Sequence, residues 1–101
     1  MQQAWPFDQP PNYTAITLRQ VVRERAPVLL VTHDEDDHGW QFLDGSPEPK
    51  KEDAVLCCME HIVEADPTLL EIADLPIGWR AWRTAVGQAW TRRKSVQADQ
   101  A

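Results

Sequence analysis

Glycine, cysteine and long apolar runs are scarce in this chain of 101 residues. The four glycines are scattered, so the sequence contains no glycine-rich loop of the kind that cradles phosphate groups. No apolar run approaches the roughly 18 residues that a transmembrane helix needs, so we expect no contact with a membrane. No basic segment followed by an apolar run opens the chain, and we therefore expect no signal peptide.

The two cysteines, Cys57 and Cys58, are neighbours in the sequence. Adjacent residues of a helix point in different directions, which disfavours a disulfide between them. Two reduced thiols fit a cytoplasmic protein better than a small disulfide-stabilised one. We therefore expect a cytoplasmic protein with free cysteines.

The net charge of -6 is unevenly distributed along the chain. Residues 1–75 carry five Lys or Arg against fifteen Asp or Glu, and residues 76–101 carry five against one. Either the basic segment lies across the acidic body, or the surface is bipolar and steers a charged partner. The acidic balance of the whole chain argues against nucleic acid as a ligand.

The length of the chain and its ordinary composition, 43% hydrophobic and 26% charged, predict one domain. Residues 1–12 contain three prolines and read as an extended arm, which Trp5 and Phe7 attach to the body. The domain itself is predicted over residues 13–94. Residues 95–101 are predicted to form a flexible tail.

Three segments have the composition of strands. Residues 13–18 are β-branched and aromatic, and residues 28–32 form a short apolar run typical of a central strand that is buried on both faces. Residues 39–45 form the third, with Trp40 and Phe42 on one face. The second and third strands flank an acidic run, and we predict a hairpin with the acids at its turn.

Helical spacing appears in the middle of the chain. Residues 19–26 fit a short helical turn that buries two valines, Val21 and Val22. A longer helix is predicted over residues 52–65, and a shorter one begins at Asp66 as N-cap and Pro67 as first helical residue.

Residues 78–93 fit two structures. Trp79, Trp82 and Trp90 lie at helical spacing, whereas the aromatic content and two glycines favour a hairpin with strands at 79–84 and 89–93. We adopt the hairpin. The predicted fold is therefore α+β, with an antiparallel sheet and one long and one short helix packed on one face.

The stretch HDEDDHGWQFLDG, followed by an acidic helix and LPIGWRAWR, resembles small bacterial proteins of a domain-of-unknown-function family. Its core pattern, Asp-x-Gly-Trp-x-Phe, is matched by Asp37, Gly39, Trp40 and Phe42. Some members are predicted immunity proteins of polymorphic toxin systems. The resemblance covers about half to two-thirds of the chain and leaves out the N-terminal arm and the C-terminal segment. It implies an α+β fold, a bacterial and cytosolic origin and protein binding, and it supplies no catalytic residues.

The acidic run supports three interpretations: a solvated turn, a surface that meets a partner, or a metal site. Carboxylates suit Mg²⁺, Ca²⁺ or Mn²⁺ and imidazole suits Zn²⁺ or Fe, although the spacing matches no calcium-binding loop. The candidate metal ligands are His33, Asp34, Asp36 and His38.

Cys57 and His61 stand four residues apart, which on one helix would place half of a zinc site on one face. The alternative is a structural cysteine beside a surface histidine. A nucleophilic Cys–His pair lacks an orienting acid and an oxyanion donor. No Ser-His-Asp order can be defended either, so an enzyme is the less favoured class.

Trp79, Arg80, Trp82 and Arg83 form a second cluster, in which strand alternation puts Arg80 and Trp82 on one face. Trp and Arg are enriched at binding hot spots, but the tryptophans could equally fill the core. Aromatic and basic strands can also bind single-stranded nucleic acid, which the acidic remainder disfavours.

We predict a protein-binding module, in one version immunity-like, whose acidic turn meets a basic patch on its partner. The alternatives are a metal-binding protein or metal-dependent enzyme with its site at the His33–His38 turn, and a structural accessory domain without a ligand. No cofactor is expected beyond a divalent metal in the first alternative. The partner-contact candidates are Asp34, Glu35, Asp36, Asp37, Trp40, Arg80, Trp82 and Arg83.

Overall fold

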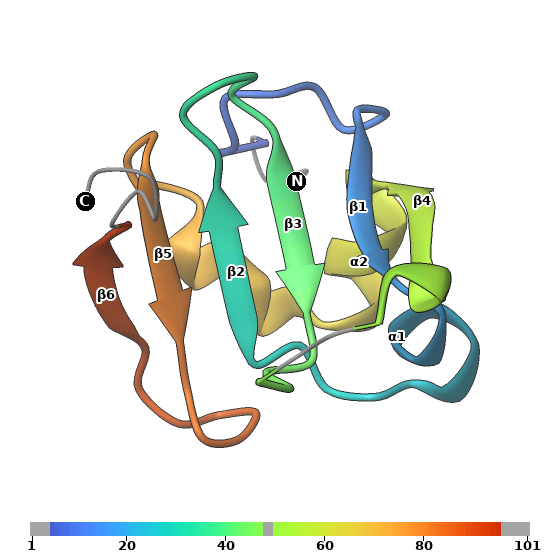
Figure 1. The fold of residues 1–101 in the computed structure, drawn as a ribbon. Helices are drawn as coiled ribbons and strands as arrows, with labels where there is room; N and C mark the ends of the chain where they lie inside the picture. The colour runs from blue at the N-terminus through green and yellow to red at the C-terminus, as the bar shows by residue number, and fades with distance from the viewer. Residues whose placement is uncertain (1–4, 48–49, 96–101) are drawn as a thin grey trace, which may run out of the picture.

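A six-stranded mixed sheet forms the centre of the fold (Figure 1). The computed structural model describes residues 5–47 and 50–95. In the sheet the strands follow the order β4-β1-β3-β2-β5-β6. Their bounds are β1 Thr14–Leu18, β2 Leu30–His33, β3 Trp40–Leu43, β4 Ala54–Cys58, β5 Trp79–Trp82 and β6 Thr91–Lys94.

The helices are short and lie mainly behind the sheet in Figure 1, where α2 and the segment that follows it cross the back of the strands. They are α1 Arg19–Glu24, α2 Met59–Ala65 and the 3-10 helices η1 Lys51–Asp53 and η2 Pro67–Ile72. We call the opposite side of the sheet, which carries no helix of the described residues, the uncovered face. The predicted α+β class is confirmed, with helices on one face of the sheet.

The sheet is mixed, whereas the sequence predicted an antiparallel one. Every neighbouring pair is antiparallel except β1 and β3, which run parallel. The difference arises because α1 and the loop after it carry the chain past the place where β2 would pair with β1. The β2–β3 hairpin then folds back, and β3 enters the sheet between the two.

The predicted helix over residues 52–65 is wrong in its first half. The chain forms η1 and then β4, and α2 begins only at Met59. β4 pairs with β1 over five residues, from Thr14 opposite Cys58 to Leu18 opposite Ala54. Valine and cysteine are modest helix formers, and pairing satisfies the backbone groups along the edge of β1, so the strand prevails.

The core lies between the sheet and the helices. Strand alternation buries Val31 on β2, Trp40 and Phe42 on β3, and Ala81 on β5. The helical side adds Met59, Ile62, Val63, Leu69 and Ile72. The predicted facing of Trp40 and Phe42 is confirmed. β2, however, is not buried on both faces, because Leu30 and Thr32 are only half-buried.

The predictions for the short helix after Asp66 and for the valines of α1 have different outcomes. Asp66 caps η2, since its carboxylate accepts a hydrogen bond from the Thr68 backbone N–H at 3.1 Å, and Pro67 occupies the first helical position. The predicted short helix is therefore present, as a 3-10 helix. On α1 the expected inward facing of two valines is confirmed for Val21, which is half-buried and packs against the core, and is wrong for Val22, which is 46% exposed.

The C-terminal hairpin is confirmed. β5 and β6 pair from Trp79 opposite Lys94 to Trp82 opposite Thr91. Gly87 in the connecting loop has a φ of 91°, a left-handed conformation that glycine adopts without strain. In the predicted tail, the backbone N–H of Ser95 donates to the Gly78 carbonyl at 2.7 Å, and residues 96–101 lie outside the described residues.

The described part of the N-terminal arm, residues 5–12, is attached to the body as predicted. Phe7 is buried in the core, and the Trp5 ring packs on it with a centroid distance of 5.1 Å. Residues 1–4 of the predicted arm lie outside the described residues. Within the described ranges, no helix has the length and apolar character required to cross a membrane.

Candidate functional site

The acidic turn, formed by Asp34, Glu35, Asp36 and Asp37, joins β2 to β3 as predicted. Asp34 closes the hairpin, since its backbone N–H donates to the Gly39 carbonyl at 2.8 Å. Its carboxylate accepts from Thr32 Oγ1 at 3.0 Å and from Gln41 Nε2 at 2.8 Å. The other three acids are exposed. Asp37 also accepts a hydrogen bond from the Gly39 backbone N–H at 2.9 Å, so the turn presents three exposed carboxylates and is held in shape by Asp34 and Asp37.

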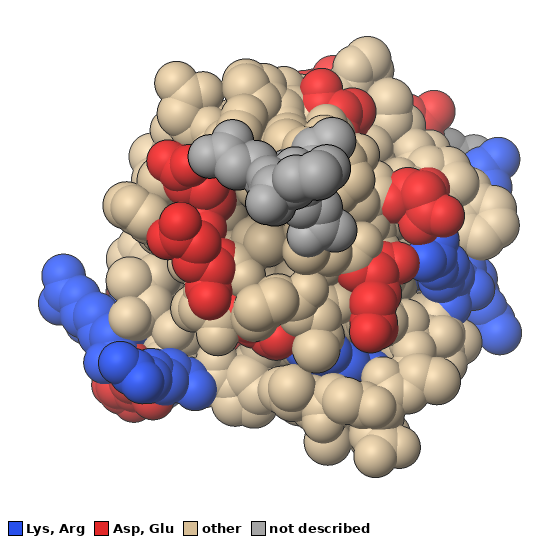
Figure 2. All heavy atoms as spheres, turned by 180° about the vertical axis from the view of Figure 1, so that it is seen from behind, with Lys and Arg blue, Asp and Glu red and all other residues tan. Residues whose placement is uncertain are grey.

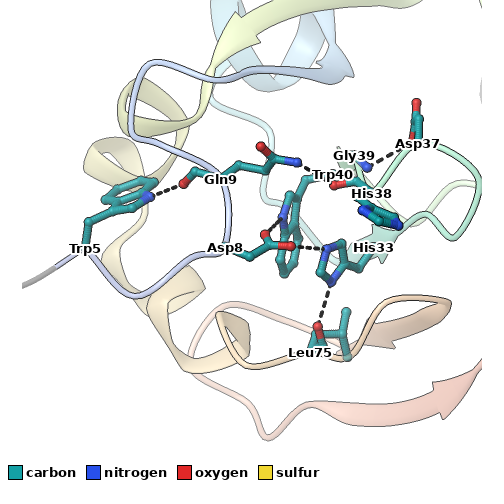
Figure 3. Close-up of polar contacts among 9 residues, drawn as sticks. All are labelled: Trp5, Asp8, Gln9, His33, Asp37, His38, Gly39, Trp40 and Leu75. Atoms are coloured by element: carbon teal, nitrogen blue, oxygen red, sulfur yellow. Dashed lines mark hydrogen bonds and ion pairs between the residues drawn. The ribbon is translucent and has the colours of Figure 1, made fainter.

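His33 lies beneath this turn and is 4% exposed. Its Nδ1 is 2.7 Å from the Leu75 carbonyl oxygen and its Nε2 is 3.0 Å from Asp8 Oδ2 (Figure 3). A carbonyl and a carboxylate both accept hydrogen bonds, so both contacts are made when each ring nitrogen carries a proton. In that state His33 and Asp8 form an ion pair that attaches the N-terminal arm to β2.

Trp40 is also part of this buried network. Its ring stacks on His33 with a centroid distance of 3.9 Å, and its Nε1 donates to Asp8 Oδ1 at 2.8 Å (Figure 3). Trp40 and Phe7 meet in a T-shaped arrangement, with 5.0 Å between ring centroids. At 1% exposure Trp40 is closed to a partner, so its predicted place among the contact residues is wrong.

The predicted metal ligands of the turn do not converge. Both nitrogens of His33 are engaged, and His38 is exposed with a left-handed φ of 57°. Throughout the described residues, the one group of three or more His, Cys, Asp or Glu side chains close enough to share an ion consists of Cys58, Glu60 and His61. The geometry therefore does not favour a metal site at the turn.

The negative charges of the acidic turn act on the Tyr13 side chain. Burial raises the pKa of the Tyr13 hydroxyl, and the negative charges of Asp37, Asp34 and Asp8 raise it further. The same hydroxyl packs against the turn: a Cβ added at Gly39 would lie 2.8 Å from Tyr13 Oη. The Gly-Trp pair of the motif is thus explained by close packing at the first residue and burial at the second.

The second predicted cluster divides between two environments. Arg83 is buried, and its guanidinium is held by the Asp66 carboxylate at 2.7 Å and by the Val28 carbonyl. It cannot contact a partner, and this part of the prediction is wrong. Arg80 and Trp82 alternate with it and lie on the uncovered face, as strand geometry predicted.

We define the Trp82 patch as Trp82, Arg80 and Arg93. Trp82 is half-buried, and the guanidinium carbons of Arg80 and Arg93 lie 5.6 Å and 6.0 Å from its ring centre. Both arginines are exposed. A shallow hollow of about 500 Å³ lies beside the ring, bounded by Leu30 and Pro47. Across the sheet, the same face exposes Ile16 and Leu56, which pair in register.

A groove that the sequence did not predict lies between α1, α2 and η2. Its volume is about 900 Å³, and its apolar lining includes Val22, Ile62 and Val86. Cys57 and His61 also line it, but Cys57 comes from β4, so the predicted placement of the pair on one helix is wrong. Burial raises the pKa of the Cys57 thiol and Cys58 raises it further, which disfavours a reactive thiolate. The exposure of Val22 and Val86 is the signal that marks this groove.

The helical side of the molecule is acidic. α2 and η2 carry Glu60, Glu64 and Glu71, and Asp74 follows them. Figure 2 shows Asp and Glu side chains spread over this side, with most Lys and Arg toward its flanks. The Trp82 patch is therefore basic, whereas the opposite side of the molecule is acidic.

Comparison with known proteins does not identify a family or a function for the chain. No family model, curated protein or solved structure matches the chain. The resemblance to a bacterial domain-of-unknown-function family therefore stays a prediction.

Proposed function

We propose that the protein is a protein-binding module that contacts its partner through the uncovered face. The observation that carries the proposal is the Trp82 patch, an indole whose ring centre has two guanidinium carbons at 5.6 Å and 6.0 Å, on a face without a described helix. Trp and Arg are the residues most enriched at binding hot spots. Exposed Ile16 and Leu56 supply apolar area on the same face.

The patch favours an acidic partner surface. Arg80 and Arg93 stand directly opposite each other on β5 and β6, and like charges in this position destabilise a strand pair. The four ion pairs found among residues 5–47 and 50–95 involve neither arginine. A carboxylate of the partner would relieve this repulsion and accept hydrogen bonds from both guanidinium groups.

The acidic turn belongs to the same binding surface in this proposal. Asp34 bonds Thr32 and Gln41, whose side chains lie on the uncovered face, so the turn stands at one end of that face. A partner with a basic region facing the turn would be oriented by the two opposite charges, which mainly affects association rate and specificity. The same acids would repel a nucleic acid, which disfavours that ligand.

The wider context of the proposal follows from the sequence. Two free thiols support a reducing, cytoplasmic location. The resemblance to a bacterial family supports an immunity-like role as one version of protein binding. The metal-dependent alternative at the turn loses support from the engaged nitrogens of His33. A structural accessory domain without a ligand offers no relief of the repulsion between Arg80 and Arg93 beyond their contacts with Trp82.

Charge reversal in the patch tests the proposal. We expect the double variant R80E/R93E to lose at least about tenfold in affinity for a protein captured by the wild type, because two hot-spot charges become repulsive. R23E is the matched control, since Arg23 is exposed on α1 and lies in no ion pair of the described residues. The measurement is capture from cell lysate, followed by kinetic binding of the purified partner.

The comparison of R80E/R93E with R23E also states which results would reject the proposal. Equal loss in R80E/R93E and R23E, or no loss in either, rejects the uncovered face as the contact surface. Failure of the wild type to retain any protein, with binding of a single-stranded oligonucleotide instead, rejects protein binding.

Reversal of the turn gives a different kinetic signature. In E35K/D36K, which leaves the Asp37 bond to Gly39 in place, we expect the association rate constant for the same partner to fall, with a smaller change in the dissociation rate constant, because rim charges act mainly on encounter. The effect should shrink as salt is raised, since exposed charges are screened over about 10 Å at 0.1 M ionic strength. An association rate that is unchanged at low salt removes the turn from the proposal.

A further inference from the structure

We propose that Cys58, Glu60 and His61 bind a single divalent cation of the zinc class. We call these three residues the Cys58 cluster. The site lies where β4 ends and α2 begins, apart from the Trp82 patch on β5 and β6, and the inference does not depend on the proposed function. The cluster is one residue away from the Cys57–His61 pair that the sequence suggested.

The geometry of the cluster follows from the start of α2. The Cys58 sulfur, a Glu60 carboxylate oxygen and a His61 ring nitrogen all lie within 4.8 Å of one another. Cys58 is the N-cap residue and His61 is the third residue of the helix, two positions whose side chains face each other, as in a capping box. Cys58 makes no side-chain capping hydrogen bond, so its sulfur is available to an ion.

The backbone that carries these ligands is fixed. The N–H of Met59 donates to the Tyr13 carbonyl and the N–H of Glu60 donates to the Pro11 carbonyl, both at 2.9 Å. Cys58 also pairs with Thr14 on β1. Because these N–H groups are occupied, the first turn of α2 is not offered to an anion. Because the backbone is held on both sides, binding needs only side-chain adjustment.

The donor atoms select the ion. Thiolate, imidazole and carboxylate together suit Zn²⁺, whereas Mg²⁺ and Ca²⁺ prefer a set of oxygens. Three protein ligands leave the fourth tetrahedral position to water. Cys58 and Glu60 are half-buried and His61 is exposed, so a cation can enter from solvent. Binding releases the thiol proton to solvent, and affinity should therefore rise with pH.

Cobalt substitution tests the site, because a Co²⁺–thiolate bond produces a charge-transfer band in the near ultraviolet. We titrate the reduced full-length protein with Co²⁺ alone and expect the band to saturate at one equivalent and to disappear when Zn²⁺ is added. C58S should lose the band. C57S is the matched control, since it removes the adjacent thiol outside the cluster and should keep the band.

Two further variants test the remaining ligands. H61A and E60Q should each weaken Co²⁺ binding by more than about tenfold, since even the loss of a hydrogen-bond partner of a metal ligand costs 10- to 100-fold in affinity. A wild-type amide NMR spectrum should show paramagnetic broadening centred on residues 58–61, a result that depends on no variant.

The inference is overturned by the absence of a saturable band in the wild type, by a band that survives in C58S, or by broadening centred elsewhere in the chain. Unchanged affinity in both H61A and E60Q would also overturn it, because a lone cysteine would then be the ligand.

Discussion

Replacement of Arg83 by methionine is expected to lower the free energy of unfolding by about 3–5 kcal/mol, the range for breaking a buried ion pair from one side. The Arg83 side chain is fully buried, and its guanidinium donates to Asp66 Oδ2 at 2.7 Å and to Thr68 Oγ1 at 2.8 Å. It also donates to the Val28 carbonyl through Nε and Nη2 and lies 4.1 Å from the ring centre of Trp90. Methionine keeps most of the volume and loses every one of these bonds.

Lysine separates charge from geometry at this position. R83K keeps a positive charge near Asp66, but it cannot reproduce the planar set of donors that reaches Val28 and Thr68 at once, so we expect an intermediate loss. In the double variant R83M/D66N the unpaired carboxylate is gone, and stability should recover in part. The measurement is urea unfolding followed by far-ultraviolet circular dichroism. A loss below about 1 kcal/mol in R83M would show that Arg83 contributes no more than an ordinary hydrogen bond.

The position of Arg83 explains why it must be a structural residue. Arg83 follows the end of β5 and joins it to η2, through Asp66 and Thr68, and to Val28 in the segment before β2. These elements are far apart in sequence, and no other described side chain bonds all of them. Arg80, three residues earlier, lies on the opposite face and remains exposed. The same residue type thus has two roles that strand alternation alone separates.

Much of the fold could be predicted because local patterns are informative. The β2–β3 hairpin follows from two apolar strands around acids that suit a turn, and the β5–β6 hairpin follows from aromatic content. The prediction of a helix over residues 52–58 was wrong because Val55 and Cys58 fit both a helix and a strand. Only the free edge of β1, which no local pattern contains, decides in favour of β4.

The site was harder to predict than the fold. The motif residue Trp40 and the candidate Arg83 both have the composition of a hot spot, but their burial depends on contacts with Asp8 and Asp66. Those contacts cross 32 and 17 residues of sequence. The sequence paired His61 with Cys57, four residues earlier, whereas the structure groups it with Cys58, three residues earlier, because Cys57 lies in β4 and α2 begins only at Met59. The grouping of Cys58 with Glu60 and His61 therefore depends on the exact start of α2.

Loss of the Asp8 carboxylate should release the N-terminal arm and destabilise the fold. In D8A we expect the free energy of unfolding to fall by about 2 kcal/mol, because the Trp40 Nε1–H group loses a charged acceptor and His33 Nε2 loses its contact with the Asp8 carboxylate. Full desolvation of two donors would cost more. The Asp8 side chain is 41% exposed, however, so water can reach the vacated position and reduce the loss.

Two neighbouring variants make this expectation specific to the buried network. D8N keeps one oxygen acceptor, so it can serve His33 or Trp40 but not both, and its loss should lie between zero and that of D8A. Q9A is the matched control, because Gln9 also bonds from the arm, to the His38 carbonyl, but at an exposed position where a lost hydrogen bond matters little. Urea midpoints for the three variants give the comparison. If D8A and Q9A unfold at the same urea concentration, the contact of Asp8 with His33 does not hold the arm, and burial of Phe7 must do so alone.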